Sequence, residues 1–329
     1  MDSVEIRAES LSFTRYVMKD RAPISALFPS GSLSATCGIY ILEFAAGERY
    51  VGQTTNLVSR YVDHARHHRD IVAFQFAPCP QSLLDQYERA IVQREQITHS
   101  LRNLMLTNRP GGNEDLEVTV AEAFSVTLPW LRSDRATTRS ESGTSKNGRF
   151  WSLSRHPHYP KIREHLARYV HETIPDPLNT AGLLWSLTAL PSTSRAAGRR
   201  RLLTVNCGSV ETLFLTEYTD TQGDQEMVWS INLWPDVPDK TLRTLHQQWP
   251  GDLTYESSQH YKSVGPLTSV DCRGQSAVGE VLTQAAVLDA AYRLNVMLMR
   301  RAKTIYTKHH NEAFSADVLR EAAGLARNE

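Results

Sequence analysis

The side chains best suited to catalysis lie between positions 37 and 88. They are Tyr40, Tyr50, Arg60, His64 and Glu88. Arg60 and His64 are four positions apart, the spacing that places two side chains on one face of a helix. A guanidinium can contact phosphate oxygens, a phenol or imidazole can move a proton, and a carboxylate can hold a hard divalent cation. Together these groups suit the hydrolysis of a phosphodiester.

Two short strands are expected to position the tyrosines. Residues 38–44 are β-branched and aromatic, residues 45–48 supply a turn, and residues 49–52 begin the return strand. Tyr40 and Tyr50 would therefore lie on neighbouring strands.

A helix follows these strands and is expected to carry the arginine and the histidine. Gly52 ends the second strand at a point where a side chain would obstruct a ligand or the helix, and Thr54 or Thr55 would cap the helix. Arg60 and His64 project side by side at the edge of its apolar stripe, which consists of Leu57, Val58, Tyr61, Val62 and Ala65.

A third strand over 72–76 and a long helix over 82–106 complete this region. Glu88 lies at the border of the apolar stripe of that helix, where a carboxylate would be half-buried and available to a metal ion. Glu95 lies seven residues further on and shares the border. Spacing alone leaves both glutamates open as the metal ligand.

At these residues the sequence resembles the GIY-YIG nuclease superfamily, whose two triplets appear here as Gly38-Ile39-Tyr40 and Tyr50-Val51-Gly52 at a usual separation. Members include phage homing endonucleases, some restriction enzymes and the incision nuclease of bacterial excision repair. The resemblance covers roughly residues 36–110. It implies a three-stranded sheet flanked by helices and an endonuclease that cuts DNA with Mg²⁺ or Mn²⁺.

The resemblance also implies roles for individual residues. Arg60 matches the helix arginine of the family, His64 matches the histidine one turn later, and Glu88 is the best match for the metal-binding glutamate. An asparagine often follows the glutamate helix, and Asn108 is the first match, with Asn103 as the alternative. Gly52 and Asn108 are then expected to border the substrate. Gln53 departs from the lysine that some members place after the second triplet.

Composition restricts the class of protein. Lysine plus arginine equals aspartate plus glutamate at 36 each, so contacts with double-stranded DNA must come from local patches rather than a global positive field. No apolar run approaches the roughly 20 residues that span a bilayer, and no signal peptide is recognisable. A cytoplasmic protein without a membrane partner is expected. The cysteines are far apart, which argues against a zinc ribbon or disulfide framework: Cys37, Cys79, Cys207 and Cys272.

The chain is expected to be α+β with two domains. Residues 1–30 form an N-terminal extension, 31–117 the nuclease-like domain, 118–149 a connecting segment and 150–329 a second α+β domain. The boundary is placed in 133–148, because this stretch is rich in Ser, Thr, Arg and Gly and has little to bury.

The second domain is expected to combine a hairpin of residues 212–219 and 226–234 with helices at 161–173, 239–249, 276–303 and 315–325. Arg199, Arg200 and Arg201 are candidate contacts to a DNA backbone, although basic runs are commonly solvated faces. Trp185, Trp229, Trp234 and Trp249 are expected to lie in the core. The fold of this domain is not recognised.

The leading hypothesis is a metal-dependent DNA endonuclease, restriction-like or defence-related, whose second domain recognises DNA, a ligand or a partner. One alternative is a nucleic-acid-binding protein that does not cut, which Gln53 and the uncertain glutamate favour. Another is a ligand-gated effector whose second domain is a sensor or homo-oligomerisation module, with residues 276–303 as an interface helix.

Overall fold

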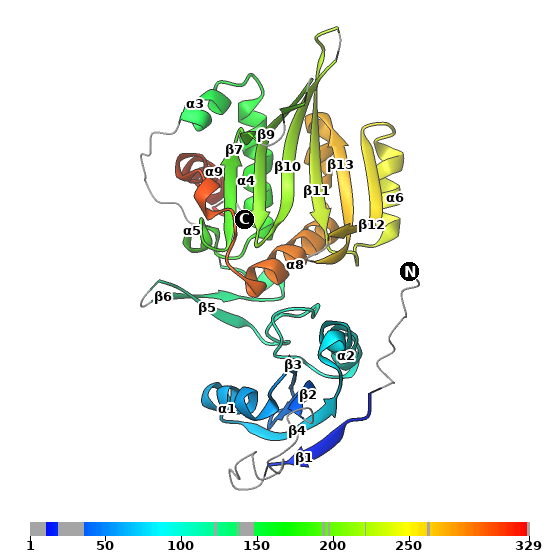
Figure 1. Cartoon of the computed structure of the whole chain (residues 1–329). Coiled ribbons are helices and arrows are strands. Elements are labelled where there is room, and N and C mark those ends of the chain that lie inside the picture. The colour runs from blue at the N-terminus through cyan, green and yellow to red at the C-terminus, as the bar shows by residue number, and fades with distance from the viewer. Residues whose placement is uncertain are drawn as a thin grey trace. The chain divides into compact units, whose positions relative to one another are not determined.

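The computed structural model describes residues 11–18, 36–121, 124–136, 138, 148–192, 195–196, 198–220, 222–261 and 264–327 (Figure 1). Most of the expected N-terminal extension and of the polar stretch 133–148 lies outside these residues. The chain is α+β, as expected, and divides into two compact units, Met1–Asn113 (unit 1) and Glu114–Glu329 (unit 2). Among the helices described, none has the length and apolar character to cross a membrane.

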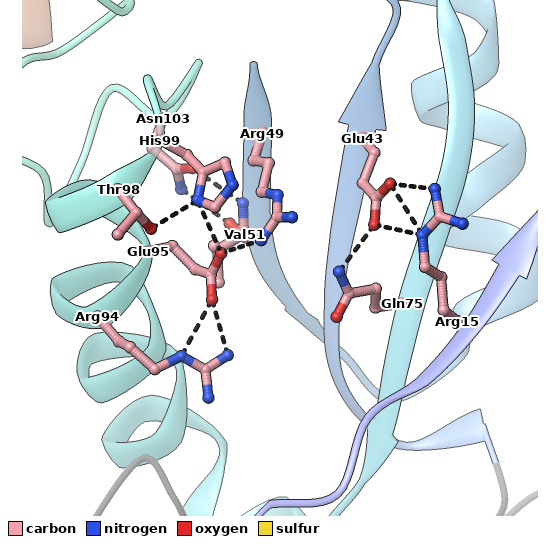
Figure 2. Close-up of polar contacts among 10 residues, drawn as sticks. All are labelled: Arg15, Glu43, Arg49, Val51, Gln75, Arg94, Glu95, Thr98, His99 and Asn103. Carbon is pink, nitrogen blue, oxygen red and sulfur yellow. Dashed lines mark hydrogen bonds and ion pairs between the residues drawn. The ribbon is translucent and has the colours of Figure 1, made fainter. Parts of the chain in front are cut away.

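Unit 1 contains the expected sheet with one strand more than the sequence predicted. Its antiparallel strands lie in the order β1-β4-β2-β3, with bounds Thr14–Val17, Ile71–Pro78, Gly38–Phe44 and Arg49–Thr54. The additional strand, β1, comes from the segment expected to be an extension. It pairs with β4, and Arg15 forms a forked ion pair with Glu43, which also accepts a hydrogen bond from Gln75 (Figure 2).

The register of the β2–β3 hairpin sets the positions of the two tyrosines. Tyr40 lies directly opposite Gly52, and Tyr50 lies opposite Leu42. Because side chains alternate between the faces of a sheet, Tyr40 and Tyr50 are diagonal neighbours on one face. Their ring centroids are 6.3 Å apart.

Helix α1 (Leu57–His67) begins as expected, but its cap differs from the prediction. The side chain of Asn56 accepts the Ser59 N–H at 3.2 Å and so caps the helix. The predicted cap at Thr54 or Thr55 is therefore wrong. The Thr54 hydroxyl instead accepts the N–H of Asn56 at 2.9 Å, which fixes the turn before the helix.

Helix α2 (Leu84–Thr98) follows the 3₁₀ turn Gln81–Leu83 and is shorter than the predicted 82–106. It ends because the chain turns into an extended path at His99 and runs beside the start of β3. There the Arg49 N–H donates to the Ser100 carbonyl and the Arg102 N–H donates to the Arg49 carbonyl. These bonds satisfy backbone groups on the edge of the sheet. Periodicity along one helix cannot reveal such pairing with a distant strand.

The sheet of unit 1 is buried on both faces. One face packs on α1 through Tyr40, Leu42, Phe44, Leu57, Phe74 and Phe76, and the opposite face packs on α2 through Ile39, Ile41, Val51, Leu84, Ile91 and Val92. This explains why β2 is almost continuously apolar, since a strand covered on both faces has no solvent side.

Asn103 ties the segment after α2 to β3 (Figure 2). Its buried side chain accepts the Val51 N–H at 2.9 Å and donates to the Val51 carbonyl at 2.8 Å. One side chain thus satisfies both backbone groups of a residue at the sheet edge, as a neighbouring strand would.

Unit 2 is built on a larger antiparallel sheet (Figure 1). Its strand order is β12-β13-β11-β10-β9-β7, with the short β8 (Arg195–Ala196) also paired to β9. The strand bounds are Leu253–Tyr261, Gly265–Arg273, Gln225–Leu233, Val210–Thr219, Arg199–Cys207 and Trp185–Ala189. The predicted hairpin is confirmed as β10–β11, and Trp185 and Trp229 are fully buried in the core, as expected.

Helices pack on this sheet and on one another. They are α3 (Gly148–Ser154), α4 (Tyr159–Thr173), α5 (Pro177–Thr180), α6 (Asp239–Gln248), α7 (Gly274–Val281), α8 (Ala285–Arg301) and α9 (Glu312–Leu325). Helix α8 packs on β9, β10 and β11, and α4 packs on α7, α8 and α9. The single helix predicted over 276–303 is wrong, because the chain turns between α7 and α8 at residues 282–284.

The segment predicted to connect the domains instead belongs to unit 2. Strands β5 (Leu116–Ala121) and β6 (Phe124–Leu128) form a hairpin whose Leu128 is completely buried in the core of that unit. The Arg300 guanidinium donates to the Leu128 carbonyl, and the Tyr292 hydroxyl donates to the Pro129 carbonyl at 2.9 Å. The division between units falls at Asn113 rather than in 133–148, because local composition does not register these distant anchors.

Replacing Asn103 should destabilise unit 1. Asn103→Ala leaves the buried N–H and C=O of Val51 without their partners, at a cost of about 3 kcal/mol. All six tryptophans lie in unit 2, so the unfolding of unit 1 is best followed by hydrogen exchange of its own amides. The matched control is Asn108→Ala, which truncates an exposed side chain and should change stability by less than about 0.5 kcal/mol. Equal effects of the two substitutions would contradict the anchoring role.

Candidate active site

The hydroxyl of Tyr40 is the centre of a polar cluster in unit 1. Tyr40 is only 1% exposed, and its oxygen lies 2.7 Å from His64 Nε2 and 3.1 Å from Arg60 Nε. Because the Arg60 N–H can only donate, the phenol oxygen accepts from Arg60, and in the tautomer whose Nε2 is unprotonated the phenol donates to His64. Three residues singled out in the sequence therefore converge from β2 and α1.

Gly52 makes this convergence sterically feasible. A Cβ at position 52 would lie 2.4 Å from the Tyr40 hydroxyl oxygen and 2.5 Å from its Cζ. The tyrosine ring thus crosses over β3 at a residue with no side chain and reaches α1. A side chain at Gly52 was expected to obstruct a ligand or the following helix, and in the structure it would collide with Tyr40.

Tyr50 borders the same cluster in a more open position. Its ring lies 4.8 Å from that of His64, measured between centroids, and it is half-buried. Hydrogen bonding and charge interaction with Tyr40 raise the pKa of Arg60, and Tyr50 adds to this in the same way. Arg60 remains a cation held between the two phenols, with part of its side chain open to solvent.

Burial keeps both proton-carrying groups of the cluster neutral. It raises the pKa of Tyr40 well above its usual value, Tyr50 raises it further, and the bond from Arg60 only partly opposes this. Burial, assisted by Arg60 and His68, lowers the pKa of His64 to about 4. A neighbouring cation such as Arg60 favours the ionised form of a phenol. In the folded unit burial outweighs this effect, and Tyr40 is a phenol facing a neutral imidazole.

Glu88 lies on α2, half-buried and within electrostatic reach of the cluster. Its charge raises the pKa of Tyr40, and Arg60 in turn lowers the pKa of Glu88 slightly. The net pKa of Glu88 is nevertheless raised, chiefly by burial and further by Asp85. Its carboxylate accepts a hydrogen bond from the side-chain amide of Gln53 at 3.1 Å, and hydrogen bonding by Gln53 opposes the rise in pKa only in part. Glu88 is therefore a carboxylate whose negative charge is poorly compensated.

Glu95, the alternative metal ligand, has a different environment (Figure 2). It is buried and forms ion pairs with Arg49 and Arg94, and His99 lies 3.6 Å away. Burial alone would raise the pKa of Glu95, but the hydrogen bonds from Arg49 and Arg94 bring it below its usual value. Its charge is already neutralised by the protein, so the geometry favours Glu88 over Glu95 as a cation ligand.

Glu88 and a second carboxylate could hold a divalent cation. The Gln53 amide nitrogen donates to both Glu88 and Asp85, the latter at 2.7 Å, so the two carboxylates lie near each other. Mg²⁺ commonly takes one or two carboxylates and completes its shell with waters and phosphate oxygens, which this donor set fits. Among the described residues there is no group of three or more His, Cys, Asp or Glu arranged for a metal. Asp85 was not among the residues predicted from the sequence, although its i,i+3 spacing to Glu88 was a usable signal.

Two further predictions differ from the structure. Asn103 rather than Asn108 contacts the second triplet strand, while Asn108 is exposed and its backbone N–H donates to Gln96. In β9 the side chains alternate, so the three arginines do not form one face. Arg201 is 8% exposed, lies 3.7 Å from the Phe214 ring centroid and is therefore not available to a DNA backbone.

Comparison of the chain with protein-family models, with curated proteins and with solved structures found no match in any of the three. The geometry of the cluster therefore carries the functional argument.

The stability of unit 1 should respond strongly to neutralisation of Glu95 and little to neutralisation of Glu88. Glu95→Gln removes a buried charge that two arginines depend on, and should destabilise unit 1 by about 2–3 kcal/mol. Glu88→Gln removes a poorly compensated charge and should alter stability by less than about 0.5 kcal/mol. Hydrogen exchange of β2 and β4 amides measures both effects. A larger loss for Glu88→Gln than for Glu95→Gln would show that Glu88 is the structural residue.

The stability of unit 1 should depend on pH through His64. Its folded pKa of about 4 lies below the ordinary value of 6.5, so the unfolded chain binds more protons between these values. The stability that unit 1 gains from keeping His64 neutral is complete above pH 6.5 and is lost as the pH falls towards 4. The difference in unfolding free energy between the wild type and His64→Gln should therefore become smaller as the pH is lowered from 6.5 to 4. NMR-detected urea unfolding of unit 1 checks this, and a pH-independent difference would mean that His64 is not buried as a neutral ring.

Proposed function

We propose that unit 1 is a metal-dependent endonuclease that hydrolyses phosphodiester bonds of double-stranded DNA. One observation carries the proposal: the hydroxyl of Tyr40 is held by both His64 and Arg60, beside the poorly compensated carboxylate of Glu88. The resemblance of the two triplets to GIY-YIG nucleases supports the same activity. A restriction-like or defence-related role in the cytoplasm is part of the proposal, because a small cutting unit joined to a larger one suits selective cleavage.

Arg60 would bind the scissile phosphate. Its guanidinium stays charged and has five N–H donors, so the bonds to Tyr40 and Tyr50 leave donors for a nonbridging phosphate oxygen. This places the phosphate next to the phenol oxygen. The exposed side of Arg60 gives a substrate access to that position.

Tyr40 and His64 would accept the proton of the attacking water. In the resting state the phenol donates to the unprotonated Nε2 of His64. If the phenol oxygen takes a proton from water, its own proton can pass to His64 Nε2 over 2.7 Å. Tyr50, less buried and beside His64, could orient the water.

Glu88, with Asp85 as a second donor, would hold Mg²⁺ or Mn²⁺. When bound, such a cation supplies charge neutralisation at the phosphate and the leaving oxygen. The positive charge would also remove the unfavourable effect of burial on Glu88, because a carboxylate with a raised pKa gains from a neighbouring cation.

A second candidate function is DNA binding without cleavage. It is favoured by Gln53, whose side-chain amide donates hydrogen bonds to both Glu88 and Asp85, where a cation would bind. It is also favoured by the neutral state of Tyr40 and His64. A protein of this kind would bind DNA in the presence of a chelator, and its binding would not depend on Glu88.

A cleavage assay distinguishes the two functions. Full-length protein with Mg²⁺ or Mn²⁺ should nick or linearise supercoiled plasmid, and a chelator should abolish this. Tyr40→Phe, Arg60→Ala and Glu88→Ala should each lower the rate by roughly 100-fold or more. Tyr40→Phe is the most informative variant because it keeps the ring over Gly52.

The matched control is Arg66→Ala, which removes an arginine from the exposed side of the same helix, where it pairs with Asp63. Its rate should stay within about twofold of the wild type, as is usual for substitutions outside a site. Metal-independent binding without cleavage would favour the second function, and cleavage that survives all three site substitutions would refute the proposed site.

A further inference from the structure

Unit 2 contains a cavity with an unusual concentration of positive charge. Its volume is about 780 Å³, within the range of cavities that bind small molecules. Residues from α3, the end of β7, the start of β9 and the segment before α9 line it. Its charged and imidazole-bearing lining residues are Arg149, Arg200, Lys308, His309 and His310.

No carboxylate is among the described residues that line this cavity. Arg200 does pair with Glu217, but at 3.8 Å, and Glu217 is closer to His156, at 2.9 Å. More than half of the Arg200 side chain is exposed. The pairing of Arg200 with Glu217 is therefore long, and the guanidinium is accessible to other partners.

His310 is fixed at the wall of the cavity as a neutral donor. Its Nδ1 accepts the backbone N–H of Leu187 at 3.1 Å, so the proton of the neutral ring must be on Nε2. The ring also lies edge-on to Trp185, with centroids 6.0 Å apart. Asn311, the N-cap of α9, adds the positive end of a helix dipole, while Glu312 in the first turn of that helix opposes it.

A second cavity in unit 2, of about 530 Å³, shows that arginines alone do not make such a site. Arg132, Arg135 and Arg293 line it, and each is paired with a carboxylate: Arg132 with Glu172 and Asp289, Arg135 with Glu172, and Arg293 with Asp236. Its charges are satisfied within the protein. The larger cavity differs in two of its cations: Lys308 is exposed, and Arg200 is more than half exposed with only a long ion pair to Glu217.

We propose that this larger basic cavity binds clustered phosphoryl oxygens. Arginine and lysine side chains together with neutral N–H donors are the groups that recognise phosphate, and among the described lining residues there is no tyrosine, tryptophan or phenylalanine on which a base could stack. Recognition is therefore of phosphate rather than of a base. Two sources present this chemistry: a soluble nucleoside polyphosphate and the successive phosphates of a DNA strand. The inference does not depend on cleavage by unit 1.

Binding assays on the full chain in a chelator test the proposal without any cleavage. Tripolyphosphate and ATP are titrated by calorimetry, and a short 5′-phosphorylated DNA is titrated by fluorescence anisotropy. Lys308→Ala should weaken binding roughly tenfold, and Arg200→Ala with Lys308→Ala should weaken it further, because charge-assisted bonds to phosphate are lost. Lys308 is exposed on a turn, so its substitution should not disturb folding.

Lys240→Ala is the matched control, since it removes one exposed lysine of unit 2 that does not line the cavity. Weakened tripolyphosphate or ATP binding by Lys308→Ala with unchanged DNA binding identifies a soluble ligand, and weakened DNA binding identifies a strand. The proposal is overturned if none of the probes binds at millimolar concentration, or if Lys308→Ala and Lys240→Ala have the same effect.

Discussion

The close approach of the Tyr40 ring to the backbone of Gly52 is the constraint on which the geometry of unit 1 depends. A buried phenol can reach α1 only where the neighbouring strand has no side chain, and the hairpin register places Gly52 directly opposite it. Once the ring lies there, Arg60 and His64 are the helix residues at its hydroxyl. The same burial that fixes the ring also keeps Tyr40 and His64 neutral, so position and protonation have one physical cause.

The charged side chains discussed above fall into two classes. Some form ion pairs within the protein, and others have little compensation from opposite charges. Glu95 is neutralised by arginines and fixes α2 to the sheet, whereas Glu88 on the same helix is desolvated without such compensation. Unit 2 shows the same division among cations. Arg132 is fully paired, whereas Arg200 opens into a cavity without lining carboxylates. Desolvation of a carboxylate without an opposite charge beside it, as at Glu88, is a feature common at functional sites.

The sequence was sufficient for features that depend on neighbours along the chain. Alternation and helical spacing predicted the β2–β3 hairpin, α1 and the convergence of Tyr40 with His64. It was insufficient where distant segments decide the outcome. The end of α2 is set by pairing with β3, the anchoring role of Asn103 depends on Val51, and the β5–β6 hairpin joins unit 2 through Arg300. None of these partners is close in sequence, so periodicity and composition could not identify them. Nor could spacing alone choose between the two glutamates of α2, because their difference lies in which arginines surround them.

The account predicts that a cation is held by Glu88 beside the hydroxyl of Tyr40. The most direct measurement is a crystal structure of the full chain with Mn²⁺ and an uncleavable DNA duplex, in which anomalous scattering locates the metal. We expect Mn²⁺ at roughly 2.2 Å from a Glu88 carboxylate oxygen, with a phosphate between the metal and Arg60. Mn²⁺ located at Glu95 or elsewhere, or a phosphate that avoids Arg60 and Tyr40, would contradict the account.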